Sequence, residues 1–214
     1  ISKKSKIEIQ KLTSKKIVSI PFWINENIFF PIENKSNLRS KYNLQENSFI
    51  IGSFQRDTEG KDLKSPKLIK GPDRFVEIVK SFTLNNENLV VLLSGYRRQY
   101  VIKKLEEQNI NYIYVEMVDF EILNELYNCL DLYIVSSRIE GGPQAILECG
   151  ITETPIISTD VGVASEILAN ESIFNMENYE EAKPNIEVAL SNSVKHSMKN
   201  GMSKYLEMFK EVLK

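Results

Sequence analysis

Short apolar runs rich in β-branched and aromatic residues alternate with longer amphipathic stretches through the middle of the chain. Such short runs predict strands that are buried on both faces, and the alternation is typical of βαβ units in a parallel sheet. The predicted strands are Phe49–Phe54, Leu89–Ser94, Tyr112–Val115, Leu132–Ser136, Pro155–Thr159 and Ser172–Asn175.

Helical segments are predicted between these strands, because apolar residues recur there at the spacing of a helix face. After Pro72, for example, Phe75, Val79 and Phe82 fall on one face that can lie on a sheet. Helices on both faces of the sheet follow from this alternation. The predicted helices are Pro72–Leu84, Arg97–Gln108, Phe120–Cys129, Pro143–Gly150 and Val163–Ala169.

The alternation also predicts how the strands are ordered. Six strands are most simply wound in the order 3-2-1-4-5-6, because crossovers are right-handed and each half of the sheet grows away from the centre. The predicted fold class is therefore α/β, with a doubly wound Rossmann-like parallel sheet. Ligands of such sheets bind at the switch point between the first and fourth strands. The loops after Phe54 and after Ser136 should therefore line one crevice.

The segments that flank the sheet have a different composition. A short apolar run at Ile17–Ile20 ends at Pro21, and residues 25–47 are rich in Asn, Glu, Lys and Pro, as expected of a connection with one short helix near Asn37–Tyr42. The C-terminal segment predicts a final helix with an apolar stripe. Its members are Met202, Tyr205, Leu206, Phe209, Val212 and Leu213.

Composition narrows the class of protein. The 214 residues are 42% hydrophobic and 26% charged, which is the balance of a soluble globular protein. A net charge of −2 argues against a nucleic-acid partner. No apolar run is long enough for a membrane span and the N-terminal residues do not resemble a signal peptide, so a cytoplasmic location is the default expectation.

The cysteines and the histidine exclude further classes. Cys129 and Cys149 form no Cys-x-x-Cys pair and are expected to be buried thiols. His196 is the single histidine, so zinc chemistry and a Ser-His-Asp triad lack their usual residues. Neither a Walker motif nor a G-x-G-x-x-G motif follows a predicted strand, which disfavours a P-loop NTPase and a standard dinucleotide fold.

The predicted fourth strand runs into a glycine-rich turn that opens a helix. Gly141 and Gly142 let a ligand approach the backbone, and Pro143 suits the first helical turn, where free amides and the helix dipole face outward. Glu140 precedes the turn. Glu148 follows Gly142 by about 9 Å along a helix, which is roughly the span between a diphosphate and its ribose. The arrangement predicts a nucleotide-diphosphate site.

The loop after the first strand supplies cations for this site. It carries Arg56 and a second Gly-Pro helix start preceded by Lys70, so both cations should face the glycine-rich turn across the crevice. Each motif also has a plain interpretation. Glu140 could be an ordinary loop carboxylate, Glu148 a solvated helix residue, and the glycine-rich turn a simple helix cap. The backbone of Ser94 and Gly95 could contact a ligand directly, or these two residues could form an ordinary turn.

Together these residues resemble the C-terminal half of the GT-B fold in the retaining glycosyltransferases of family 4. The matching segments are IPFWIN at Ile20–Asn25, IGSFQRD at Ile51–Asp57, PKLIKGPDRFVEIV at Pro66–Val79, LLSGYRR at Leu92–Arg98, LYNCLDLYIVSSRIEGGPQAILE at Leu126–Glu148 and ISTDVGVASEIL at Ile157–Leu168. The resemblance implies a nucleotide-sugar donor site.

The resemblance also implies roles for the residues. Arg56 and Lys70 would neutralise the donor diphosphate, so that no metal or other cofactor is required. Glu140 would face the donor sugar, and Glu148 would hold the ribose hydroxyls. The family's Lys-Gly usually follows the arginine closely, and the insertion Asp57–Ile69 between Arg56 and Lys70 departs from that pattern. The turn formed by Gly141, Gly142, Pro143 and Gln144 would meet the sugar and the distal phosphate, and the segments at Ser94, Gly95 and Val118 would frame the base.

The implied function is the donor-binding domain of an enzyme that transfers a sugar from a UDP-, GDP- or ADP-linked donor to a hydroxyl of a glycan, lipid or small molecule. Residues 1–16 would be a remnant of a preceding N-terminal domain, 17–46 an interdomain linker, 47–176 the donor-binding domain and 177–214 C-terminal helices. Without the N-terminal acceptor domain, the fragment should bind donor but transfer sugar poorly.

Two other functions stay open at this point, a non-catalytic nucleotide-sugar-binding module and one half of a nucleotide-sugar epimerase. For the full-length protein, peripheral association with the inner face of the membrane is also left open.

Overall fold

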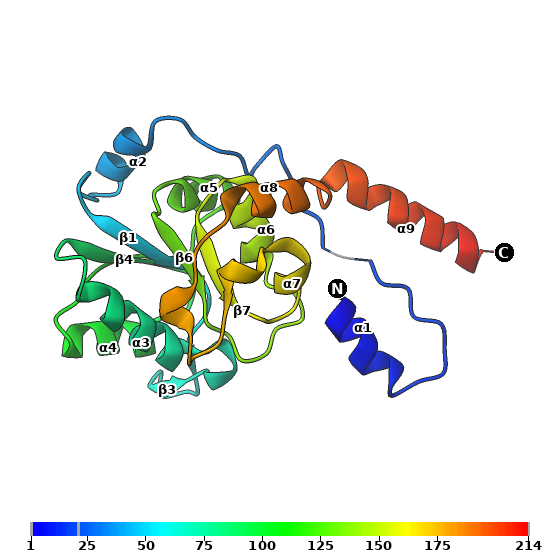
Figure 1. The fold of residues 1–214 in the computed structure, drawn as a ribbon, viewed down its shortest axis with the longest axis horizontal. Helices are drawn as coiled ribbons and strands as arrows, with labels where there is room; N and C mark the ends of the chain where they lie inside the picture. The colour runs from blue at the N-terminus through cyan, green and yellow to red at the C-terminus, as the bar shows by residue number, and fades with distance from the viewer. Residues whose placement is uncertain (1, 21, 214) are drawn as a thin grey trace.

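A six-stranded parallel sheet forms the centre of the chain, whose computed structural model describes residues 2–20 and 22–213, without the side chain of Val212 (Figure 1). The strand order is β5-β4-β1-β6-β7-β8, which is the predicted order 3-2-1-4-5-6. The prediction of a doubly wound sheet is therefore confirmed. The strands are β1 (Phe49–Ser53), β4 (Leu89–Ser94), β5 (Asn111–Val115), β6 (Leu132–Val135), β7 (Ile156–Thr159) and β8 (Ile173–Phe174).

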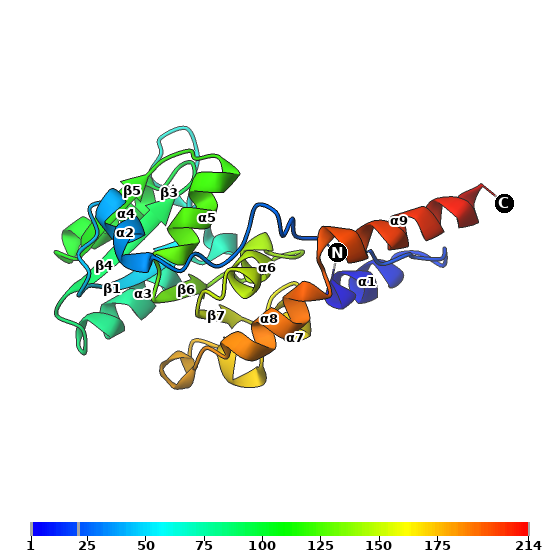
Figure 2. The same cartoon turned by 90° about the horizontal axis from the view of Figure 1, so that it is seen from above.

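Helices cover both faces of the sheet, as predicted (Figures 1 and 2). Side chains alternate along each strand, so the two faces carry separate apolar cores. On one face, Phe75 and Ile78 pack with Ile51 of β1. On the other, Leu126 and Ile146 pack with neighbouring strand residues. The first face is covered by α3 (Pro72–Thr83) and α4 (Gln99–Glu107), and the second by α2 (Lys35–Lys41), α5 (Phe120–Asn128), α6 (Gln144–Ile151) and α8 (Ile186–Val194).

Each predicted helix differs from the observed one by one or two residues at one or both ends, and two of these differences lie near the glycine-rich turn and the loop after β7. Pro143 is the N-cap of α6 and has an extended backbone (φ −65°, ψ 117°), so the helix begins one residue later, at Gln144. The helix after β7 is shorter than predicted. This helix, α7 (Ala164–Ile167), ends where Leu168 returns to an extended conformation (ψ 154°). The described residues also form short 3-10 helices, namely η1 (Leu68–Lys70), η2 (Asn170–Ser172) and η3 (Tyr179–Glu181).

The insertion after β1 folds into a small antiparallel hairpin that the sequence did not predict. Its strands are β2 (Thr58–Glu59) and β3 (Ser65–Pro66). The amide of Lys67 donates to the carbonyl of Asp57 over 2.7 Å, which closes the base of the hairpin. The amide of Thr58 donates to the carbonyl of Arg97 (3.1 Å), so the hairpin is attached to the turn before α4.

The first and last helices, α1 (Lys3–Gln10) and α9 (Met198–Val212), project beyond the sheet on the same side (Figure 2). The ring of Tyr205 on α9 packs edge-on against Trp23, with 4.8 Å between centroids. Other members of the predicted apolar stripe on this segment are exposed, namely Met202, Leu206, Phe209 and Leu213. None of the helices in residues 2–20 and 22–213 combines the length and the apolar character that crossing a membrane requires.

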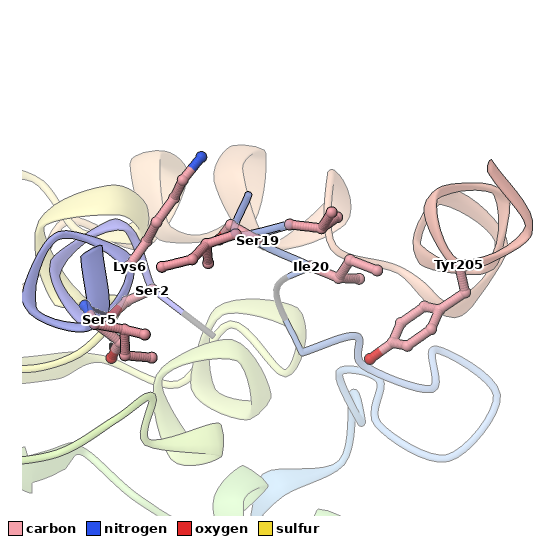
Figure 3. A pocket seen from close by; sticks show the side chains of 9 residues that line it. Ser2, Ser5, Lys6, Ser19, Ile20 and Tyr205 are labelled. Atoms are coloured by element: carbon pink, nitrogen blue, oxygen red, sulfur yellow. Dashed lines mark hydrogen bonds between the residues drawn. The ribbon is translucent and has the colours of Figure 1, made fainter. Parts of the chain in front are cut away.

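A pocket of about 250 Å³ lies between α1, residues 17–20 and α9 (Figure 3). Ser2, the N-cap of α1, and Ser5 and Lys6 of the helix line it on one side, and Tyr205 of α9 lines it on the other. None of the residues predicted to bind a ligand is among its lining residues. The site of interest therefore lies elsewhere, at the switch point of the sheet.

Candidate functional site

A cavity of about 260 Å³ opens at the carboxyl ends of β1 and β6. Its walls come from the loop after β1, the loop after β6 and the adjoining helices α5 and α6. This confirms the expectation that the two loops line one crevice. The lining residues are Phe54, Gln55, Lys70, Phe120, Leu123, Tyr127, Tyr133, Val135, Glu140, Pro143, Gln144, Ala145 and Glu148.

The two loops are locked together directly beside the cavity. Gly71 adopts a left-handed conformation (φ 62°), and a Cβ atom there would lie 1.9 Å from the carbonyl oxygen of Ser136. The Ser136 hydroxyl in turn donates to the Gly71 carbonyl (2.8 Å). The Arg138 guanidinium donates two hydrogen bonds to the Asp73 carboxylate (2.8 and 2.6 Å) and lowers the pKa of that carboxyl. The position of Lys70, next to Gly71, is therefore fixed.

Lys70 and Glu140 form an ion pair at the cavity wall, Nζ to Oε1. The same carboxylate oxygen accepts a hydrogen bond from the Ser137 hydroxyl (3.0 Å). The Gln55 amide donates to the backbone carbonyl of Lys70 (3.0 Å) and holds this segment from the other side. The structure thus brings Lys70 to the glycine-rich turn in spite of the insertion before it.

Glu148 lies at the floor of the cavity and is only 7% exposed. This burial excludes the alternative of a solvated helix residue. The Tyr127 hydroxyl donates to its Oε2 over 2.6 Å. Burial raises the pKa of Glu148 to about 7, and the hydrogen bond from Tyr127 opposes that rise. The pKa of Tyr127 is itself raised well above its usual value, mainly by burial, so its hydroxyl remains a donor.

Three aromatic rings form the rest of the floor. Ring centroids lie 4.9 Å apart for Phe54 and Tyr127, 5.4 Å for Phe54 and Tyr133, and 5.4 Å for Tyr127 and Tyr133. Phe120, at the start of α5, lines the same cavity and is 59% exposed. These residues were not predicted from the sequence to belong to the site. The feature of the sequence that could have pointed to them is that aromatic side chains flank the ends of two adjacent predicted strands.

The glycine-rich turn is held from outside the cavity. A Cβ atom on Gly162 would lie 2.7 Å from Pro143, so the loop after β7 supports the turn closely. The Ser5 hydroxyl of α1 donates to the Gly141 carbonyl (3.3 Å). The turn leads into α6, whose first amides have no partner within the helix and carry the positive end of its dipole. An anion is therefore favoured at this end of the cavity.

A second cavity, of about 520 Å³, lies on the other side of Glu140. It is bounded by α1, by the loop after β6 and by the loop after β7. Glu140 lines both cavities, whereas Gly141 lines only this larger one and Gly142 lines neither. The Glu140 carboxylate therefore stands between the two cavities.

The structure does not bring all the predicted residues to the smaller cavity. Arg56 is exposed, and its Nε donates to the carbonyl of Thr58 (3.0 Å). The Ser94 hydroxyl donates to the carbonyl of Glu116 (3.0 Å). Gly95 (φ 92°) is likewise bonded within the chain, and Val118 packs at the edge of the core. None of these four predicted residues lines the cavity.

Arg98 has a structural role that was not predicted from the sequence. Its guanidinium is fully buried and pairs with Asp57, with 2.7 Å between Nε and Oδ2. It also donates to the carbonyls of Gln55 and Ser94 and to the hydroxyl of Ser53. This one side chain therefore ties the carboxyl ends of β1 and β4 together behind the site.

Metal-ligating and thiol groups are not clustered here. In residues 2–20 and 22–213, no group of three or more His, Cys, Asp or Glu side chains could hold a metal ion. Cys129 and Cys149 are free and buried, as predicted. Among the residues that line the cavity, the charged side chains are those of Lys70, Glu140 and Glu148.

Comparison with known proteins identifies relatives of this chain. The family described as "Glycosyl transferases group 1" matches residues 34–207. The alpha-galactosylglucosyldiacylglycerol synthase of Streptococcus pneumoniae is 26% identical over 164 residues, which cover 72% of this chain and 40% of that protein. The chain therefore spans less than half the length of this relative.

Solved structures show the same fold. Sucrose-phosphate synthase from Thermosynechococcus elongatus aligns with a TM-score of 0.78 and 16% identity over 99% of this chain and 57% of its own. A glycosyltransferase from Rickettsia africae aligns with a TM-score of 0.78 and 21% identity over 100% and 62%. Anabaena HepE, in complex with UDP and glucose, aligns with a TM-score of 0.74 and 12% identity over 99% and 61%.

Proposed function

The chain belongs to the group 1 glycosyl transferases, and from this premise we propose that it is the donor-binding domain of a retaining, metal-independent enzyme of glycosyltransferase family 4. The enzyme would transfer a sugar from a nucleotide diphosphate sugar to an acceptor hydroxyl. The observation that carries this proposal is the grouping of Lys70, Glu140 and Glu148 around one cavity at the switch point of the sheet.

Each part of the donor has a matching group. Lys70 and the start of α6 supply positive charge for the diphosphate. Glu148 supplies a carboxylate for the ribose hydroxyls, and the aromatic floor with Phe120 supplies apolar surface for the nucleoside. HepE structures contain UDP and UDP-glucose, so UDP is the first nucleotide to test.

The chemistry follows from these positions. The bond between the anomeric carbon and the diphosphate breaks, and its electron pair leaves with the diphosphate oxygen. Lys70 and the helix dipole stabilise the charge that develops on this leaving group. Arg56 would join them by exchanging its hydrogen bond to Thr58 for the diphosphate. The acceptor oxygen then bonds to the anomeric carbon, and its proton passes to the departing diphosphate oxygen, while Glu140 faces the sugar.

The acceptor is proposed to lie in the larger cavity beside Glu140, with an N-terminal domain completing its site. The streptococcal relative is named as the synthase of a diacylglycerol glycolipid, so a lipid acceptor is the first to test with the full-length enzyme. We expect the 214-residue chain to bind donor and to transfer sugar poorly. For the full-length enzyme we propose a cytoplasmic location.

Calorimetric titration with UDP, GDP and ADP in EDTA tests the proposal. One nucleotide should bind saturably, and Lys70→Ala and Glu148→Ala should each weaken it at least tenfold. Arg56→Ala tests whether the exposed arginine takes part. Lys103→Ala is the matched control, because Lys103 is an exposed lysine of α4 away from the cavity. Absence of binding to the folded chain would contradict the proposal.

A further inference from the structure

Tyr127 of α5 and Glu148 of α6 are joined by a buried hydrogen bond at the floor of the smaller cavity. The hydroxyl lies 2.6 Å from Oε2, and the two residues are 1% and 7% exposed. Within residues 2–20 and 22–213 the Glu148 carboxylate has no other hydrogen bond, so its Oε1 is left for a ligand in the cavity.

The direction of the Tyr127 hydroxyl is fixed by the rings around it. Phe54 and Phe29 pack on it edge-on, with 4.9 Å and 6.3 Å between centroids, and the Tyr133 ring lies tilted against it at 5.4 Å. A close-packed ring of this kind cannot swing without disturbing its neighbours. The hydrogen bond therefore holds the Glu148 carboxylate in one orientation.

We propose that Tyr127 is a positioning residue for donor binding: it aims the Glu148 carboxylate at the ribose and stabilises its ionised form, so that nucleotide binding is coupled to loss of a proton from Glu148. The inference rests on the proposed function, because it takes a ribose as the ligand of Glu148. It goes beyond that function by adding a residue and a proton to donor recognition.

Among the ionisable groups around the carboxylate, Tyr127 is the one that stabilises its ionised form. The ionisable groups nearest to Glu148 in the cavity and the packed elements are Tyr127, Tyr133, Cys149, Lys70 and Glu140. Lys70 is already paired with Glu140. Burial raises the pKa of Glu148 to about 7, and only the Tyr127 hydrogen bond lowers it. Ribose hydroxyls donate hydrogen bonds most strongly to a charged acceptor, so the ionised carboxylate is the form that binds.

The test is the pH dependence of UDP binding to the 214-residue chain and to Tyr127→Phe, measured by calorimetry between pH 6 and 9. The affinity of the wild-type chain for UDP should rise with pH. The midpoint of this rise should lie near pH 7, where half of the Glu148 carboxyl groups are ionised. Loss of the hydroxyl should move this midpoint upward by about one pH unit. At pH 7 the variant should then bind about fivefold more weakly, and at pH 9 it should recover to within about twofold.

Tyr112→Phe is the matched control, because the Tyr112 hydroxyl donates to the exposed Glu106 over 2.8 Å. It should leave the profile unchanged. If Tyr127→Phe binds like wild type at every pH, or more weakly by one constant factor, the inference is overturned while the proposed function stands.

A second measurement does not depend on UDP. The Glu148 carboxyl carbon can be followed by NMR during a pH titration, with its signal assigned by its loss in Glu148→Gln. We expect a higher midpoint in Tyr127→Phe than in wild type, and an unmoved midpoint would overturn the inference. If UDP, GDP and ADP all fail to bind, the proposed function falls and the donor-binding role of Tyr127 falls with it.

Discussion

Replacing Glu148 by glutamine should stabilise the folded chain in neutral and alkaline buffer. Glutamine has nearly the same shape, can still accept the hydrogen bond from Tyr127, and carries no charge at any pH. The wild-type carboxylate must ionise in a site that is only 7% exposed. The variant therefore removes the cost of burying a charge and leaves the packing almost unchanged.

The magnitude follows from the two pKa values. The carboxyl ionises near 4.5 in the unfolded chain and at about 7 in the folded chain. Between these two pKa values the folded chain binds one proton more than the unfolded chain, so the free energy of unfolding falls as the pH rises. The contribution of this carboxyl to stability is fully present below pH 4.5 and is lost above pH 7. The loss amounts to about 3 kcal/mol. The stability difference between Glu148→Gln and wild type should grow by that amount between pH 4.5 and pH 8.

Urea denaturation followed by circular dichroism at several pH values measures this difference. Glu106→Gln is the control, because Glu106 also accepts a tyrosine hydroxyl but is exposed. The difference in the free energy of unfolding between Glu106→Gln and wild type should not change with pH. The reasoning is refuted if the curve for Glu148→Gln is equally flat, or if the variant loses stability relative to wild type as the pH rises.

Further predictions concern the neighbouring groups. Glu140→Gln should bind UDP roughly fivefold more tightly in calorimetry, because Lys70 loses its ion-pair partner and becomes available to the diphosphate; equal or weaker binding would contradict this. Gly71→Ala should lower the free energy of unfolding by about 3 kcal/mol, since its Cβ would meet the Ser136 carbonyl in a left-handed conformation. Arg98→Met should lower it by about 4 kcal/mol in the same urea assay, because a buried carboxylate would lose its ion pair; a change below about 1 kcal/mol would show that the pair is dispensable.

Much of the fold follows from rules that operate along the chain. The apolar face with Phe75 and Val79 predicts α3, and the right-handed crossover rule orders the strands correctly. The hairpin in the insertion was not predicted, because β2 and β3 are too short to show a period of their own. Pro143 was placed one residue inside α6, since the sequence gives its fixed φ but not its ψ.

The site was predicted in part. Lys70, Glu140 and Glu148 meet at one cavity, because strand order alone places the loops that carry them together. Tyr127 and Arg98 were missed, since each lies in or beside an apolar segment and its partner is distant in the sequence. Arg56 forms a local hydrogen bond that no residue pattern reveals.

The hydrogen bond from Lys67 to Asp57 closes the inserted hairpin before the chain reaches Lys70. Beyond this closing bond, the amide of Lys70 donates to the carbonyl of Lys67 (2.8 Å). The Lys70 carbonyl accepts a hydrogen bond from Gln55, and the Lys70 side chain pairs with Glu140. The length of the insertion is therefore decoupled from the position of this cation. Residues can therefore be added to, removed from or changed in charge within the hairpin, beyond this closing bond, without moving the lysine that lines the cavity.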